Sequence, residues 1–237
     1  MLDLTNTPFA SFEIPKDVEV IQKENTLCIT RFNWEYQEAL AFQKYSQSFI
    51  QKNRKLKIFI FCSHPHCFTM GRGNERGQDH LQDFTEAQAS LLSFPLNKIH
   101  RGGGITFHFP GQWIFYPIVA LNENFSMCDL TSWLLKSVRD VLTNEFKIDK
   151  VLAANKLLGV WREKQKIASI GVGVDRFVTE HGIAVNLITD DKMFNELNKI
   201  NPCGMAATTY IAADSLIEDA TEIIENFHRA YLANHFA

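Results

Sequence analysis

The sequence predicts a mixed α and β fold, α/β in the broad α+β sense, with mainly antiparallel strands. Short runs rich in β-branched and aromatic residues recur along the chain, and several are joined by short turns. Between them lie stretches with apolar residues at helical spacing. The 237 residues, 46% of them hydrophobic, suffice for one full core. Because no stretch rich in Pro, Gly and Ser marks a linker, we expect a single domain spanning 1–237.

The N-terminal half predicts strand, helix, strand. Residues 18–31 and 57–61 are the strand-like runs, and apolar residues recur near helical spacing within 34–53. Residues 105–119 alternate bulky and polar side chains around Pro110-Gly111, which predicts two strands joined by a turn. A long helix is expected from about Asp129. Its apolar face consists of Leu130, Trp133, Leu134, Val138, Val141 and Leu142.

The C-terminal half predicts three strands over 158–162, 166–174 and 177–187, the first two joined by a charged turn. A short helix follows over 191–199, and Pro202 stops it. Its apolar face consists of Met193, Phe194, Leu197 and Ile200. The last predicted helix is amphipathic and contains Ile223, Ile224, Phe227 and Tyr231.

Composition disfavours several classes of function. The formal net charge is −3 and no cluster of Lys and Arg provides the basic stripe that nucleic acid requires. The first residues lack the pattern of a signal peptide, and no run of about 18 apolar residues could cross a bilayer. Five cysteines, an odd number spread along the chain, favour a reducing compartment. We therefore expect a cytoplasmic protein without nucleic-acid or membrane partners.

A glycine-rich run predicts a wall of a ligand-binding site: Arg101-Gly102-Gly103-Gly104-Ile105-Thr106-Phe107-His108. Three consecutive glycines leave backbone N–H groups open to a phosphate, a carboxylate or a carbonyl oxygen. The chain contains no P-loop, and residues 71–77 miss the dinucleotide fingerprint by one residue. Binding of a nucleoside triphosphate and binding of a dinucleotide are therefore both disfavoured. A turn or bulge without a ligand is the alternative.

Cys62, His64, His66 and Cys67 superficially resemble a metal site. Ligands this close fall on opposite faces of a strand and no second pair completes the set, so we expect no metal there. We expect His64-Pro65 to end the strand with the imidazole facing the pocket. Cys28 and Cys128 are interpreted as a buried thiol and a thiol just before a helix.

Cys203 and Lys166 are the candidate reactive pair. Cys203 lies between Pro202 and Gly204 in a predicted tight turn, and Lys166 begins a predicted strand. Taken separately, Cys203 fits a buried thiol in a turn as well as it fits a nucleophile, and Lys166 fits a surface lysine better than it fits a catalytic residue. Placed side by side, the ammonium group would stabilise the thiolate and lower the thiol pKa from about 8.5 toward neutrality. The lysine would then activate a nucleophile.

Several motifs in the same order resemble the lipoyl(octanoyl) transferase family, the octanoyl-acyl-carrier-protein:protein N-octanoyltransferases. They begin with Tyr36-Gln37-Glu38-Ala39-Leu40 and His64-Pro65, and continue with the glycine run and Pro110-Gly111-Gln112. The later motifs are Gly159-Val160-Trp161, Lys166-Ile167-Ala168-Ser169-Ile170-Gly171, His181-Gly182-Ile183-Ala184-Val185-Asn186 and Asn201-Pro202-Cys203-Gly204.

The resemblance implies a biotin/lipoate protein ligase-like catalytic domain, a mixed sheet flanked by helices. It implies transfer of an octanoyl group from octanoyl-acyl carrier protein to a lysine of a lipoyl domain, without a cofactor. The acceptors would be lipoyl domains of 2-oxoacid dehydrogenase complexes or the glycine cleavage H protein. Cys203 would accept the acyl group and Lys166 would lower its pKa. The implied substrate-binding residues are Arg101, Gly102, Gly103, Gly104, Ile105, Thr106, Phe107, His108, Ser169, Ile170, Gly171, Gly182, Ile183 and Ala184.

The chain departs from the family pattern at positions that bear on acyl-chain preference. Gly104 replaces a common glutamine, Phe107 a tyrosine, Phe109 a glycine and Leu158 a proline, and His66-Cys67 replace small or apolar residues. Arg72, Arg76 and Arg101 are the candidates for local attraction of an acidic carrier protein.

Three alternative functions stay open from sequence. One is an ATP-dependent lipoate or biotin protein ligase, which would use the lysine without a cysteine nucleophile. Another is a non-catalytic binding module for acyl carrier protein. The third is a cysteine hydrolase in which His108 or His181 acts as the base.

Overall fold

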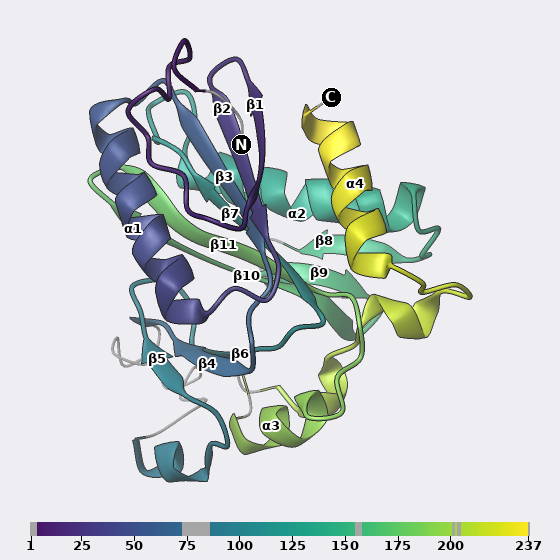
Figure 1. The fold of residues 1–237 in the computed structure, drawn as a ribbon. Coiled ribbons are helices and arrows are strands. Elements are labelled where there is room, and N and C mark those ends of the chain that lie inside the picture. The colour runs from purple at the N-terminus through teal and green to yellow at the C-terminus, as the bar shows by residue number, and fades with distance from the viewer. Residues whose placement is uncertain (1–3, 73–85, 155–157, 201, 203–204, 237) are drawn as a thin grey trace.

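A computed structural model describes residues 4–72, 86–154, 158–200, 202 and 205–236 (Figure 1). The chain forms an eight-stranded sheet in the order β1-β2-β3-β7-β11-β10-β9-β8, in which only β2 and β3 are parallel neighbours. The predicted mainly antiparallel sheet is confirmed. Its strands are β1 (Glu19–Lys23), β2 (Thr26–Arg31), β3 (Lys57–Cys62), β7 (Gln112–Ile118), β8 (Val151–Ala154), β9 (Gly159–Arg162), β10 (Gln165–Asp175) and β11 (Val178–Asn186).

Helices cover both faces of this sheet (Figure 1). The first helix, α1 (Tyr36–Lys52), packs on β3, β7 and β11, while α2 (Met127–Asn144) and α4 (Ile223–Phe236) pack together on the opposite face. Successive side chains along a strand point to opposite faces of the sheet and so contribute to two cores. Ile58 and Ile60 pack on the α1 side, whereas Phe59 and Phe61 pack on the α2 side. The Ser126–Asp129 capping box starts α2, two residues before the predicted start.

A second, three-stranded sheet lies at one end of the large sheet, next to α3 (Met193–Ile200) (Figure 1). Its order is β5 (Leu96–Lys98), β4 (Cys67–Met70), β6 (Ile105–His108), with β4 and β5 parallel. Its apolar residues form a third core with Met193, Leu197 and Ile200. Short 3-10 helices, η3 (Glu86–Leu91), η5 (Ala207–Thr209) and η6 (Ala213–Leu216), complete the described elements.

Several predicted elements need correction. The run 18–31 is two strands, because Glu24 adopts a φ of 49° in a tight turn and folds β1 back on β2. The strands within 105–119 form as predicted, yet β6 belongs to the small sheet and β7 to the large one. Phe194 is 38% exposed, so Glu196 replaces it on the buried face of α3. Cys128 lies inside α2 and is exposed.

No helix in the described ranges is long and apolar enough to cross a membrane.

Candidate active site

A cavity of about 250 Å³ lies where the small sheet, β9, β10 and α3 meet. Most of its walls are apolar, which suits the acyl part of a ligand. Several polar groups also reach it, among them Lys166, Ser169 and Asn186. The apolar lining includes Ile105, Phe107, Phe109, Trp161, Ile170, Met193, Leu197, Pro202 and Met205.

Arg101 organises the glycine loop, which we define as residues 101–104. Its guanidinium donates to the carbonyl oxygens of Gly102 and Gly104 at 2.9 and 3.0 Å. It also donates to Thr69 O at 3.0 Å, and to the hydroxyls of Thr69 and Thr106 at 2.8 Å each. The side chain is thus buried and directed into the protein, so Arg101 does not belong to a surface that attracts a carrier protein.

The glycine loop is only partly the open amide wall that the sequence predicts. The N–H of Gly102 is not free, because it donates to Val172 O on β10 at 3.1 Å. Gly103 has a φ of +80°, a conformation that favours glycine. Gly103 and Gly104 line the cavity, together with Ile105, Thr106 and Phe107. The loop therefore presents two of its three glycines to the cavity.

Lys166 enters the cavity from the start of β10 and is 4% exposed. The pairing of β9 with β10 shifts between Lys166 and Ala168, a bulge of the kind that redirects a side chain. The ammonium nitrogen lies 5.3 Å from the ring centroid of Trp161, a cation–π distance. Gly159 leaves room for this arrangement, since a Cβ there would overlap Cε of Lys166.

The segment on either side of Cys203 borders the same cavity. Pro202 and Met205 both line it, and Tyr210 donates its hydroxyl to Pro202 O at 3.3 Å. The N–H of Met205 also donates to Pro202 O, at 3.1 Å. Tyr210 is tied in turn to β10 through a bridge to Lys166. Cys203, Asn201 and Gly204 lie outside the described residues.

A smaller cavity of about 40 Å³, the inner cavity, adjoins the first, the outer cavity, and shares four of its lining residues, Arg101, Thr106, Ser169 and Ile170. The remaining predicted substrate residues line this inner cavity: His108, Gly171, Gly182, Ile183 and Ala184. Among the described residues predicted for the site, Gly102 alone lines neither cavity. The structure thus brings the other described members together around two adjoining cavities.

Two histidines and a tyrosine on the wall of the inner cavity are neutral, and the Arg101 guanidinium lies on the same wall. Burial lowers the pKa of His108 to about 3, and burial also lowers the pKa of His181 well below its ordinary value. Burial raises the pKa of the Tyr36 hydroxyl far above its usual range. His108 is held in place by Gln112 Oε1 at 2.9 Å and Thr69 Oγ1 at 3.3 Å. Both imidazoles are therefore uncharged at neutral pH.

The histidines of the 62–67 cluster do not face the cavities. His64 is fully buried, with Nδ1 2.7 Å from Trp34 O and Nε2 3.0 Å from the Tyr116 hydroxyl, so the predicted orientation toward the pocket is wrong. His66 pairs with Asp190 at 2.9 Å. These contacts stabilise the frame behind the site.

Sequence reasoning missed several lining residues. Trp161 occurs in a motif noted above, and its side chain beside Lys166 could have been inferred from the two-residue alternation of paired strands. Asn186 also occurs in a motif noted above, whereas Tyr210 carried no comparable signal, because its position depends on how distant segments pack. Phe109 gave a signal as a departure from the family pattern, and it lines the outer cavity.

Residues 35–219 match the family of the lipoyl protein ligase A/B catalytic domain. An octanoyltransferase from Geotalea uraniireducens is 30% identical, over 81% of this chain and 83% of the relative. One from Solibacter usitatus is 32% identical, over 86% of this chain and 87% of the relative. A chloroplastic octanoyltransferase of Arabidopsis thaliana is 30% identical, over 86% and 70%.

Solved structures resemble the fold. A lipoate-protein ligase A bound with ATP superimposes with a TM-score of 0.60 at 13% identity, over 90% of this chain and 83% of the other. A putative lipoate protein ligase from Thermoplasma acidophilum with bound lipoic acid superimposes with a TM-score of 0.58 at 14% identity, over 90% of this chain and 83% of the other. The predicted lipoate ligase-like architecture is confirmed.

Proposed function

The chain belongs to the octanoyltransferase family, built on the lipoyl protein ligase A/B catalytic domain, and we propose that it acts through a thioester on Cys203. It is an acyltransferase that transfers octanoyl groups in protein lipoylation. In the proposed reaction the donor is octanoyl-acyl carrier protein and the acceptor is a lysine of a lipoyl domain. Such domains occur in 2-oxoacid dehydrogenase complexes and in the glycine cleavage H protein.

One observation supports this mechanism most directly. Lys166, a buried cation, shares an apolar cavity with Pro202, the residue before Cys203, and with Met205, two residues after it. An ammonium group close to a thiol favours the thiolate, which is the nucleophilic form. The arrangement thus suits a cysteine that attacks an acyl thioester.

In the first half-reaction the Cys203 thiolate attacks the carbonyl carbon of the octanoyl thioester. A new carbon–sulfur bond forms, and the carrier's sulfur leaves as a thiolate. That thiolate takes a proton from the Lys166 ammonium group. Lys166 is then a neutral amine beside the acylated cysteine. One thioester replaces another, so the step is close to isoenergetic and requires no ATP.

In the second half-reaction the amine of the acceptor lysine attacks the acyl-enzyme. A carbon–nitrogen bond forms, the Cys203 thiolate leaves, and neutral Lys166 accepts the proton that the acceptor loses. Both members of the pair return to their starting charges. Lys166 thus alternates between stabilising the thiolate and accepting a proton.

The two cavities suit the rest of the substrate. The apolar outer cavity accommodates the acyl chain. The inner cavity, between His108 and Gly182, continues the outer cavity and shares four lining residues with it. All predicted substrate-binding residues other than Gly102 contribute to this surface. Gly102 contributes indirectly, through its bond to β10.

Other parts of the proposal rest on the sequence. Arg72 is exposed and remains a candidate for contact with an acidic carrier protein, whereas Arg76 lies outside the described residues. A cytoplasmic location is proposed from cysteine usage. One relative, from Arabidopsis thaliana, is described as chloroplastic.

A single-turnover assay tests the function. Purified protein is mixed with octanoyl-acyl carrier protein and a lipoyl domain without ATP, and the mass of the lipoyl domain is measured by mass spectrometry. We expect octanoylation of its lysine. Transfer only from free octanoate with ATP would indicate a ligase, release of free octanoate a hydrolase, and no reaction a binding module.

A further inference from the structure

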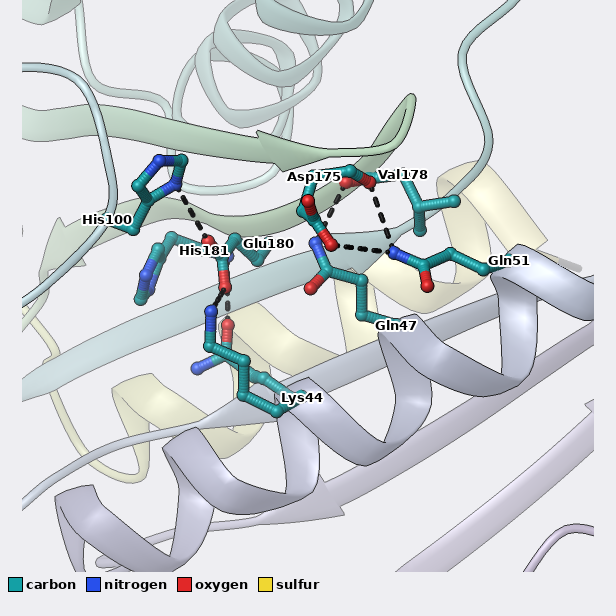
Figure 2. A network of polar contacts seen from close by, with 9 residues as sticks. Lys44, Gln47, Gln51, His100, Asp175, Val178, Glu180 and His181 are labelled. Atoms are coloured by element: carbon teal, nitrogen blue, oxygen red, sulfur yellow. Dashed lines mark hydrogen bonds and ion pairs between the residues drawn. The ribbon is translucent and has the colours of Figure 1, made fainter.

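Glu180, on β11, is a fully buried carboxylate that the reaction above does not use. One of its oxygens lies 2.6 Å from Nζ of Lys44, and the other lies 3.3 Å from Nδ1 of His100 (Figure 2). A buried carboxylate is costly unless it is paired, and removal of one partner leaves an uncompensated charge. Neither oxygen accepts a hydrogen bond of regular geometry from a described residue, so the buried acid depends on these two close contacts.

The three residues come from three separate parts of the chain. Lys44 is on α1, Glu180 is on the large sheet, and His100 directly precedes the glycine loop. Glu180 is the only one of the three that is wholly inside the protein, since the side chain of Lys44 is half-exposed and that of His100 is partly exposed. The carboxylate thus links the helix to the segment that leads into the loop.

The backbone at His100 lies directly on the sheet. A Cβ at position 173 of β10 would overlap the carbonyl oxygen of His100, and it would lie 3.0 Å from Oε1 of Glu180. Two residues later the N–H of Gly102 donates to Val172 O at 3.1 Å. Gly173 and Glu180 are paired neighbours on adjacent strands. The loop is therefore attached to β10 and β11 at one spot, immediately before it reaches the cavity.

Other contacts between α1 and the β10–β11 hairpin do not involve the loop (Figure 2). Gln47 donates to Val178 O at 2.9 Å, and Gln51 donates to the Asp175 side chain at 3.0 Å. They supply a matched control, because they join the same helix to the same hairpin away from the cavity.

We propose that Lys44, Glu180 and His100 form a positioning triad that sets the glycine loop against β10 and thereby sets the affinity for the acyl donor. This inference rests on the proposed function, since the loop forms the wall along which the acyl chain would lie. The triad does not touch Lys166 or the reacting atoms. Its loss should therefore weaken donor binding far more than it slows the chemical steps.

The test compares His100→Ala with His100→Asn. The asparagine amide nitrogen can occupy the place of Nδ1 and donate to Glu180, whereas alanine cannot. We expect His100→Ala and Glu180→Gln to raise the KM for octanoyl-acyl carrier protein about tenfold, with kcat within about threefold of the original. His100→Asn should restore the original KM. Gln47→Ala should lower Tm but leave both kinetic constants unchanged.

Hydrogen exchange of the Gly102 amide adds a measurement that needs no catalysis. We expect faster exchange in His100→Ala and Glu180→Gln, and ordinary exchange in His100→Asn and Gln47→Ala. If Gln47→Ala raises KM as much as His100→Ala, or if His100→Ala lowers Tm and leaves KM and Gly102 exchange unchanged, the triad is merely structural. If the unmodified protein transfers no octanoyl group, the proposed function fails, and the exchange data still decide whether the triad positions the loop.

Discussion

At the scale of single residues, Lys166 shows how a cation comes to be buried beside an apolar cavity. Its methylene stem passes over Gly159 and its ammonium group lies over the Trp161 ring. The stem thus packs among apolar groups while the ring face stabilises the charge. A lysine in this setting can keep its charge beside the apolar cavity.

The pairing of Lys166 with Cys203 can be tested by alkylation. In Lys166→Ala the thiol loses its stabilising cation, so its pKa should rise toward the ordinary value of about 8.5. We expect iodoacetamide to modify Cys203 at neutral pH about tenfold more slowly than in the original protein. Lys164→Ala, a change in the exposed turn before β10, is the control. An unchanged rate profile in Lys166→Ala would remove the lysine from this role.

At the scale of elements, the length of each segment and the turn residues beside it decide how well the sequence predicts it. The predicted long helix and the strands β10 and β11 are present, because their periodic patterns run over enough residues. The four-residue strand β9 was predicted from the charged turn that joins it to β10. Strands β4, β5 and β8 were missed, since each has only three or four residues and depends on partners elsewhere in the chain. The inward direction of the Arg101 side chain was also missed, because this side chain donates hydrogen bonds to Thr69 on β4, a strand that the sequence did not predict.

The bulge between β9 and β10 gives a prediction at this scale. In Gly159→Ala the added Cβ would overlap Cε of Lys166 and lie 2.6 Å from Ala168 O, a backbone atom that cannot move aside cheaply. We expect Lys166 to be displaced and kcat/KM for octanoyl transfer to fall by about 100-fold. The reaction is followed by mass spectrometry of the lipoyl domain.

Gly103→Ala provides a contrasting variant for this experiment. It strains the glycine loop, where φ is +80°, but leaves Lys166 in place. It should retain Cys203 alkylation at neutral pH, whereas Gly159→Ala should lose it. Full activity in Gly159→Ala would contradict the view that the room left by Gly159 fixes the position of Lys166.

At the scale of the whole molecule, the frame behind the cavities contains several buried, neutral histidines. Burial lowers the pKa of His64 to about 4, that of His108 to about 3 and that of His228 to about 4. In the unfolded chain the same groups titrate near 6.5. Protons therefore bind the unfolded state preferentially between about pH 6.5 and pH 4.

The free energy of unfolding should consequently fall with acidification. It should be highest above about pH 6.5 and decrease by up to about 1.4 kcal/mol per pH unit for each buried histidine, down to the folded pKa values. Urea unfolding at pH 7.5 and pH 5 measures this. His228→Gln, which removes one titrating group that bonds to Thr30 and Trp113, should show a shallower dependence. Equal stability at both pH values would contradict the buried neutral state.

The whole arrangement places two sheets, α3, Pro202, Met205 and Tyr210 about the outer cavity. The motifs named every strand of the site except β4, but they gave no distances between them, because these depend on packing between residues far apart in sequence. In the proposed mechanism an acyl thioester enters this cavity and Cys203 takes up its acyl group.

The most direct measurement is the intact mass of the protein after incubation with octanoyl-acyl carrier protein alone. We predict a gain of one octanoyl group, located on Cys203 by peptide mapping, released by hydroxylamine and absent from Cys203→Ala. An unmodified protein, or an adduct that persists in Cys203→Ala, would contradict the covalent mechanism.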